Sequence, residues 1–286
     1  MTTTGQSFSN PAPSLLDRLR RIKHVALDMD GTIYKGNTLF SVTNPFLQSL
    51  ASLGIGYTFL TNNPSKSVAD YLAHLRRLGI QATEQQLYTS AQATIEYLHA
   101  HQPAVKRLFV LGTPSMCDEF ARAGFELLPE SADSVPDAVV AGFDTTLTYP
   151  RLCRAAWWIK QGKPYFATNP DFVCPTDQPT VLVDCGSICA ALEKATGRAP
   201  DAVLGKPEPA MLEGILRRFG FQAEELAMVG DRLYTDVVMA HRLGALSVLV
   251  LTGEATAEAA KNYQPSPDLV LADVGEFGRR LLEARQ

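Results

Sequence analysis

The chain has 286 residues, which is long enough for two modest α/β domains or one large domain. Hydrophobic residues make up 46% of it and charged residues 20%, the mixture of an ordinary globular protein. A formal net charge of -4 argues against binding to a nucleic-acid polymer, which requires a basic face. No apolar run approaches the ~20 residues needed to cross a membrane.

Residues 1–13 are rich in Ser, Thr and Pro and lack the features of a secretory signal, so we expect a disordered tail. The basic segment SLLDRLRRIKH that follows is predicted to be a helix packed on the domain, with an organelle-targeting segment as the alternative. The five cysteines include no pair at CxxC spacing, which favours the reducing cytoplasm. Cys185 and Cys189 share a helix face without further metal-binding partners, so we expect them to be buried apolar positions.

The N-terminal third alternates between apolar runs and helical patterns. A buried strand is predicted at 24–30, where apolar residues lead into acidic ones, and a second strand at 55–61. Apolar residues recur at helical spacing over 46–53 and 68–78, and each pattern ends at a glycine, which commonly follows a helix C-terminus. Strands that alternate with helices predict parallel pairing in a doubly wound sheet.

The same alternation continues to the C-terminus. The predicted strands lie at 107–112, 138–143, 165–168, 180–183, 202–204, 226–229, 246–251 and 268–271, and the predicted helices at 152–159, 188–195, 211–219 and 236–243. The chain is therefore predicted to be an α/β protein, although periodicity alone does not separate its middle as a domain.

Acidic residues end the first predicted strand, and the carboxyl ends of parallel strands form the edge where ligands bind. Asp28 and Asp30, in the sequence DMDGT, are two residues apart on a strand and therefore share a face. Two carboxylates this close resist joint ionisation unless a cation or a proton lies between them. Gly31 supplies a permissive turn after them.

Two further segments carry groups that suit an anion. TNNPS at 61–65 is predicted to join a strand to a helix start, where a hydroxyl and free backbone N–H groups bind anions; a simple helix cap is the alternative. GKPEP at 205–209 holds Lys206 at the sheet edge before a helix opened by proline. A fixed ammonium there can neutralise a transferring phosphoryl group, and a solvated surface lysine is the alternative.

A last segment, GDRLYTD at 230–236, brings two more carboxylates to the same edge, those of Asp231 and Asp236. Four acids gathered in one place would destabilise the fold unless they hold a metal. Hard oxygen ligands that are few in number, completed by waters and a substrate phosphate, suit Mg²⁺. The sequence therefore predicts a magnesium site.

The order and strand-end placement of DMDGT, TNNPSKS, GKPEP and GDRLYTD resemble the haloacid dehalogenase (HAD) superfamily over almost the whole chain. The stretches YTSAQAT at 88–94, FATNPD at 166–171 and GSICAALEKATGR at 186–198 more narrowly resemble its subfamily IIA phosphatases. That subfamily includes nucleotide, phosphoglycolate, pyridoxal-phosphate and p-nitrophenyl-phosphate hydrolases.

The resemblance implies a Rossmann-like catalytic core, with a doubly wound parallel sheet, formed by residues 14–103 and 201–286. An α/β cap domain, residues 104–200, would be inserted between the second and third motifs. The implied activity is Mg²⁺-dependent hydrolysis of a small-molecule phosphomonoester through an aspartyl phosphate. A homodimer formed through the cap is a further implication.

The resemblance also implies roles for the motif residues. Asp28 attacks phosphorus, and Asp30 protonates the leaving group and then activates water. The implied metal ligands are Asp28, Asp30 through its backbone carbonyl and Asp231, with Asp236 bound through water or orienting the ligand shell. The implied phosphate-binding groups belong to Thr61, the Asn62 backbone and Lys206.

The cap is expected to choose the substrate. Asn169 is expected near the opening of the core, and Asp184 and Cys185 are candidate contacts to the leaving group. The alternative for Asp184 and Cys185 is that they end a strand and cap a helix that starts at Ser187. The physiological substrate is not predicted.

Two other functions remain open at this point. A phosphotransferase or mutase would use the same aspartyl phosphate. A non-catalytic regulatory protein would use a core of this kind that binds phosphate but has lost its catalytic activity. Asp28, Asp30 and Asp231 are all present, which disfavours a core without catalytic activity. A large cap favours hydrolysis of a small substrate.

Overall fold

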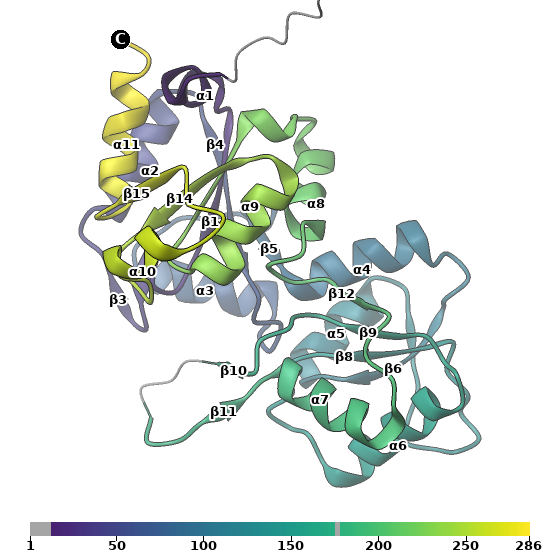
Figure 1. Ribbon diagram of the computed structural model, residues 1–286. Coiled ribbons are helices and arrows are strands. Elements are labelled where there is room, and N and C mark those ends of the chain that lie inside the picture. Colours follow the sequence, from purple (N-terminus) through teal and green to yellow (C-terminus); the bar gives the residue numbers. More distant parts are fainter. Residues whose placement is uncertain (1–12, 175–177) are drawn as a thin grey trace, which may run out of the picture.

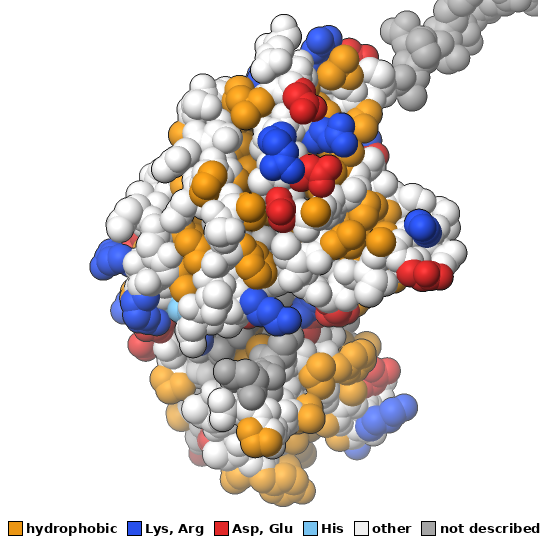
Figure 2. Space-filling view, turned by 90° about the vertical axis from the view of Figure 1, so that its left-hand side faces the viewer, with side chains coloured by type: hydrophobic (Ala, Val, Ile, Leu, Met, Phe, Trp, Pro, Cys, Tyr) orange, Lys and Arg blue, Asp and Glu red, His pale blue; other side chains and the backbone are white. Residues whose placement is uncertain are grey.

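The computed structural model describes residues 13–174 and 178–286, and nearly all of the expected N-terminal tail lies outside this part of the chain. Within it the chain forms two α/β units, each built on its own parallel sheet (Figure 1). Figure 2 shows the same two units one above the other, with acidic and basic side chains interspersed on the upper one. No helix among the described residues is both long and apolar enough to cross a membrane.

The first sheet has six parallel strands in the order β15-β14-β13-β1-β4-β5. Its strands are β1 (His24–Asp28), β4 (Gly56–Thr61), β5 (Leu87–Thr89), β13 (Leu226–Gly230), β14 (Leu246–Val250) and β15 (Leu269–Leu271). Because β1 lies in the middle and connections cross on both sides, the sheet is doubly wound, as predicted. The first strand ends at Asp28, two residues earlier than expected.

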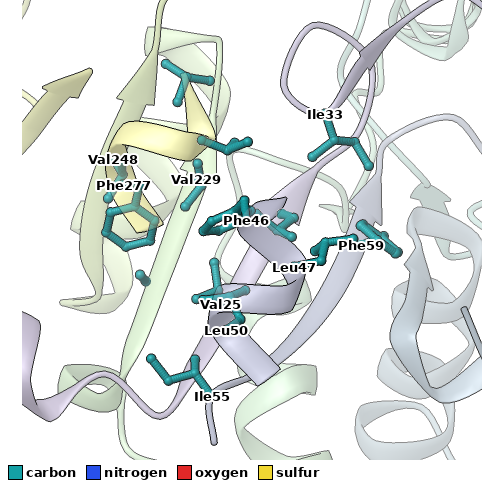
Figure 3. Packing of buried hydrophobic residues seen from close by; sticks show 14 of the residues in the cluster. Val25, Ile33, Phe46, Leu47, Leu50, Ile55, Phe59, Val229, Val248 and Phe277 are labelled. Carbon is teal, nitrogen blue, oxygen red and sulfur yellow. The ribbon is translucent and has the colours of Figure 1, made fainter. Parts of the chain in front are cut away.

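Side chains of β1 alternate between the two faces of this sheet, as the twofold period of a strand requires. Val25 and Leu27 belong to one core cluster. Figure 3 shows Val25 of this cluster with Phe46 and Phe277, which come from helices on one side of the sheet. Ala26, between Val25 and Leu27, faces the opposite cluster. The helices around the sheet are α1 (Leu15–Arg21), α2 (Thr43–Ser52), α3 (Val68–Arg77), α8 (Ala210–Phe219), α9 (Val238–Leu243), α10 (Ala257–Asn262) and α11 (Val274–Glu283).

The second sheet has five parallel strands in the order β12-β9-β8-β6-β7. They are β6 (Arg107–Leu111), β7 (Glu126–Leu127), β8 (Ala138–Ala141), β9 (Tyr165–Ala167) and β12 (Ala202–Val203), and the accompanying helices are α4 (Ser90–His101), α5 (Pro114–Arg122), α6 (Tyr149–Lys160) and α7 (Cys185–Thr196). Residues of α4 and α5 pack on one face of the sheet, and residues of α6 and α7 pack on the other.

The return to the first sheet falls slightly later than expected. β12 was predicted with the C-terminal strands, from residue 201 onward, but it pairs in parallel with β9 in the second sheet. A two-residue strand carries no pattern that says which sheet it will join. The chain therefore leaves the second sheet only after Val203.

The remaining elements are short. β2 (Tyr34–Lys35) pairs with β3 (Thr38–Leu39), and β10 (Val173–Cys174) pairs with β11 (Leu182–Val183), both antiparallel. The strand expected at 180–183 is thus the second arm of a hairpin outside the parallel sheet. Single turns are η1 (Glu84–Gln86), η2 (Ala223–Glu225) and the π-helical η3 (Leu233–Val237), which leads directly into α9.

Candidate active site

The carboxyl ends of β13, β1 and β4 lie side by side, because these three strands are neighbours in the first sheet. The acidic residues after β1 and β13 and the polar segment after β4 therefore meet at one edge. Lys206 joins them from the segment that leaves β12, three residues after that strand ends. The structure thus brings the four predicted motifs together.

Asp28 is the last residue of β1, and its side chain is only 13% exposed. Its Oδ2 accepts a hydrogen bond from Thr32 Oγ1 at 3.1 Å. Its Oδ1 forms an ion pair with Lys206 Nζ. The carboxylate is therefore fixed on both oxygens while it still has access to solvent.

Lys206 is buried, with 4% of its surface exposed, which rules out the solvated-surface alternative. Besides Asp28, its Nζ contacts Asp236 Oδ1 at 2.8 Å. Burial opposes the charge, but the two carboxylates outweigh it and raise the pKa of the Lys206 ammonium. The lysine is thus a permanent positive charge at the end of β1.

Asp231 and Asp236 are both buried beside Asp28. Burial, with repulsion from Asp28 and Asp236, raises the pKa of Asp231 to about 7. Burial raises the pKa of Asp236 to about 6, although Lys206 opposes that rise. Asp236 Oδ2 accepts the Arg232 backbone N–H at 3.2 Å, and Asp231 Oδ2 accepts the Glu254 N–H at 2.7 Å.

This arrangement fits a divalent cation. Ligand oxygens of Asp28, Asp231 and Asp236 lie within 4.8 Å of one another. Asp231 Oδ1 is buried and has no hydrogen-bond partner among the described residues, so one carboxylate oxygen is left for a ligand. An all-oxygen donor set of carboxylates matches the preference of Mg²⁺ and Ca²⁺.

Two glycines leave room for the Asp231 carboxylate. A Cβ atom on Gly253 would lie 1.9 Å from Asp231 Oδ2, and one on Gly31 would lie 2.4 Å from it. Gly31 also has a φ of +85°, which favours glycine for conformational reasons. The turn after Asp30 therefore passes close to the acidic cluster because it has no side chain there.

Asp30 has different surroundings from Asp28. It lies beyond β1, is exposed, and its carboxylate is outside the group of three that could hold a cation. Partial desolvation, followed by repulsion from Asp28, raises the pKa of its carboxyl, against a hydrogen bond from the Gly36 backbone. This carboxyl can therefore carry a proton at a higher pH than an ordinary Asp.

Thr61 ends β4, and Asn62 follows it. The expectation of a helix start here was wrong: α3 begins only at Val68, and Ser67 caps it by accepting the Asp70 N–H. Any backbone N–H groups that face an anion at 61–65 therefore belong to a loop. The Thr61 hydroxyl accepts the Asn63 N–H at 3.1 Å.

The Asn62 side chain has a structural task that the sequence analysis missed. Its Oδ1 accepts the Lys206 N–H at 2.7 Å, and its Nδ2 donates to the Lys206 carbonyl at 3.0 Å. The same Nδ2 donates to Asp171 Oδ2 of the second unit at 2.9 Å. The presence of Asp171 in the FATNPD stretch was the only sequence signal for this contact.

Of the three expected cap contacts, Asn169 and Asp184 lie together. Asn169 Nδ2 donates to Asp184 Oδ1 at 3.0 Å, and both side chains are buried. Burial raises the pKa of Asp184 to about 6. Asp184 also caps α7, which begins at Cys185, two residues before the start considered in the sequence analysis.

Cys185 faces the interior of the second unit. Its Sγ donates to the Ala141 carbonyl at 3.3 Å and lies 3.8 Å from Cys189 Sγ. Both cysteines belong to the buried cluster under α6 and α7, as expected of small apolar positions. The thiol of Cys185 is thus turned toward the core of the second unit.

Arg232 is a further charged residue at the site that the sequence analysis left without a role. Its Nε forms an ion pair with Glu254 at 3.0 Å. Burial opposes the charge of Arg232, but the surrounding acids raise its pKa. Only its place between Asp231 and Asp236 in the motif could have drawn attention to it.

Comparison with known proteins identifies the family to which the chain belongs. The family model described as haloacid dehalogenase-like hydrolase matches residues 25–126, and one described as HAD-hydrolase-like matches residues 203–277. Ribonucleotide monophosphatase NagD of Escherichia coli (strain K12) is 30% identical over 256 residues, which cover 90% of this chain and 98% of that protein.

Two solved structures are similar over most of the chain. 4-Nitrophenylphosphatase from Thermotoga maritima is 40% identical, with a TM-score of 0.86 and coverage of 92% of this chain and 98% of that one. Glycerol phosphate phosphatase from Mycobacterium tuberculosis, solved in complex with magnesium, is 33% identical, with a TM-score of 0.82 and coverage of 92% and 77%.

The chain belongs to the haloacid dehalogenase-like hydrolases. Within this family it is a phosphatase of subfamily IIA, and its activity is that of a phosphoric monoester hydrolase. The first unit is the HAD-fold core and the second is the cap domain.

Proposed function

We propose that the chain is a Mg²⁺-dependent phosphatase that hydrolyses small phosphomonoesters through an aspartyl phosphate on Asp28. The observation that carries this proposal is the side chain of Asp28, a partly exposed carboxylate at the centre of the site. One buried lysine and two further carboxylates surround it. Such an arrangement concentrates charge where a phosphoryl group would have to lie.

In the first step, an Asp28 carboxylate oxygen attacks phosphorus as the bond to the leaving oxygen breaks. Asp30 gives its proton to that oxygen, and its raised pKa favours the protonated form that this step needs. In the second step, the Asp30 carboxylate takes a proton from water while the water oxygen attacks phosphorus. The bond between Asp28 and phosphorus breaks, which releases phosphate and restores both carboxyl groups.

Lys206 and the end of β4 hold the phosphoryl group during both steps. The Lys206 ammonium is fixed beside Asp28, so it neutralises negative charge on the phosphoryl oxygens without reorganising. The Thr61 hydroxyl and the Asn62 backbone are proposed to bind the same oxygens. Asp28, Asp231, Asp236 and the Asp30 carbonyl would hold Mg²⁺, which as a Lewis acid would stabilise charge on the transferring group.

We propose only the class of the substrate, which is a small phosphomonoester. The three similar proteins are named for a ribonucleotide, a nitrophenyl ester and glycerol phosphate. Their leaving groups share little except the phosphate ester. Asn169 and Asp184, beside Asp171 at the contact with the core, remain the proposed cap contacts; the buried thiol of Cys185 gives that residue less support.

Other features of the chain are also proposals. We place the catalytic core at 14–103 and 201–286 and the cap at 104–200, with β12 as an extension of the cap sheet. A cap-mediated homodimer is supported by exposed apolar side chains on the cap, among them Trp157, Val181 and Val183. A cytoplasmic location is supported by cysteines without CxxC spacing.

The test is phosphate release by the purified protein from a panel of small phosphomonoesters, with and without Mg²⁺. We expect release that requires Mg²⁺ and falls by at least about 1000-fold in Asp28→Asn, because the amide is not a nucleophile. Equal release by wild type and Asp28→Asn would contradict the mechanism. Transfer of the phosphoryl group to an added alcohol in place of water would favour the phosphotransferase alternative.

A further inference from the structure

Lys206 is attached to the cap domain by a very short segment. β12 pairs with β9 in the cap sheet, and Leu204 N–H then donates to the Ala167 carbonyl at 3.0 Å. The lysine that contacts Asp28 follows two residues later. Among the described residues, no strand of the first sheet lies between β5 and Lys206, so other contacts must fix the Lys206 backbone.

The side chain of Asn62 supplies those contacts. It hydrogen-bonds both backbone groups of Lys206, at 2.7 and 3.0 Å, much as a neighbouring strand would. Gly205 is packed tightly between the core and the cap, because a Cβ there would lie 2.7 Å from Asn62 Oδ1 and 2.6 Å from the Thr168 carbonyl. The lysine backbone is therefore fixed where the two domains touch.

The pairing with the Lys206 N–H and carbonyl requires one orientation of the Asn62 amide, and Asp171 reinforces that orientation. A carboxylate accepts hydrogen bonds and donates none, so the group that faces it must be Nδ2. Asp171 Oδ2 accepts from Asn62 Nδ2 at 2.9 Å and from Asn169 Nδ2 at 3.4 Å. With Nδ2 directed there, Oδ1 is left for the Lys206 N–H.

We infer that Asp171 of the cap is a positioning residue, which orients the Asn62 amide and through it places the Lys206 ammonium between Asp28 and Asp236. Docking of the cap and assembly of the phosphoryl site are then one event, linked across the domain boundary. This inference rests on the proposed role of Lys206 in holding the phosphoryl group. The inferred role of Asp171 therefore concerns the phosphoryl group, the part of the substrate that all phosphomonoesters share.

Two substitutions of Asp171 separate hydrogen bonding from charge. The amides of Asn62 and Asn169 both donate to Asp171 Oδ2. Asp171→Asn keeps one acceptor oxygen at the same distance from the backbone, so this variant should retain kcat within about threefold of wild type. Asp171→Glu keeps the charge but moves the oxygen, and kcat should fall about 10- to 100-fold. The reverse order would mean that charge at this position matters, which would overturn the inference.

The losses should also have a kinetic signature. Because Asp171 acts on the phosphoryl end, Asp171→Glu and Asp171→Ala should lower kcat by the same factor for 4-nitrophenyl phosphate and for glycerol phosphate, with KM changed less than about threefold. In an Asn62→Ala background, Asp171→Ala should cause no further loss. A loss that differs between the two esters would show contact with the leaving group, and additive losses would show independent roles; either would overturn the inference.

A matched control is Glu119→Ala. Glu119 Oε1 of the cap accepts the Val68 N–H of the core at 2.8 Å, a contact between the domains that does not involve Asn62 or Lys206. We expect the Glu119→Ala variant to keep kcat within about twofold of wild type. A loss equal to that of Asp171→Ala would show that general docking of the cap is responsible and would overturn the specific role of Asp171. Asp28→Asn, assayed in parallel, reports separately on the proposed mechanism.

Discussion

At the scale of single residues, Asp28 and Asp30 show how the environment separates two identical side chains. Asp28 is paired with Lys206 and belongs to the group of three carboxylates that could hold a cation. Asp30 is outside that cluster, and the pKa of its carboxyl is raised. We therefore expect the two residues to differ in function although only Met29 lies between them.

Substitution of Asp30 should depend on the leaving group. Asp30→Asn removes the proton donor, so kcat should fall by about 100-fold or more for an alkyl ester such as glycerol phosphate. The loss should be clearly smaller in the first step for 4-nitrophenyl phosphate, because nitrophenolate leaves without needing a proton. Burst kinetics with both esters measure this step, and equal losses in it would contradict the assignment of Asp30 as general acid.

The same comparison of residues shows what the sequence could predict about the site. Asp28, Lys206, Asp231 and Asp236 were predictable because each lies directly after a strand or at a motif position. The pairing of Asn62 with Asp171 was not, because it joins residues 109 positions apart through side chains whose directions depend on the packing of two domains. The direction of the Cys185 thiol depended on where α7 begins.

At the scale of elements, His24 links the start of β1 to the end of α8. Its ring stacks on Phe219 with the ring centroids 4.5 Å apart, and its Nε2 lies 2.9 Å from Thr58 Oγ1. Burial lowers the pKa of His24 to about 4. The folded protein therefore keeps this ring neutral at pH values where an unfolded chain would protonate it.

This burial predicts a specific pH dependence of stability. Between the unfolded pKa near 6.5 and the folded pKa of about 4, the unfolded state binds more protons, so the free energy of unfolding falls as the pH falls. At pH 4, this effect of His24 lowers the free energy of unfolding by about 3 kcal/mol. Urea unfolding of His24→Asn should show a smaller decrease between pH 7 and pH 5 than wild type.

The control for this prediction is His101→Asn, at an exposed position on α4. This variant should keep the pH dependence of wild type. If His24→Asn and wild type lost the same free energy of unfolding over this pH range, the neutral, buried state of His24 would be contradicted.

Long apolar strands were the elements that the sequence predicted well. β1, β13 and β14 are buried along their apolar residues, so their pattern is unambiguous. β5 and β7, with 3 and 2 residues, were missed, although β9 and β15 were predicted at the same short length, because a run this short gives only a weak period. The pairing of β12 with the cap sheet and the β10–β11 hairpin depend on tertiary packing, which no local sequence pattern predicts.

At the scale of the whole molecule, the proposed catalytic groups lie at the edge of the first sheet, and the cap contacts that edge through Asp171. Helix α4 contributes to this arrangement because Ala91 and Leu98 pack with the cap strands, while Ala93 packs with the core helices. Asp171 adds a polar link from the cap to Asn62. Under the proposed function, the core supplies the chemistry, and we expect the cap to determine which leaving groups fit.

The measurement that tests the central claim most directly is a search for the phosphorylated enzyme. We would quench the protein in acid during turnover with a phosphomonoester and Mg²⁺ and map the modification by peptide mass spectrometry. The account predicts a phosphoryl group on Asp28 in wild type and none in Asp28→Asn. A phosphoryl group on another residue, or full turnover with no phosphorylated enzyme even in the slow-hydrolysing Asp30→Asn variant, would contradict it.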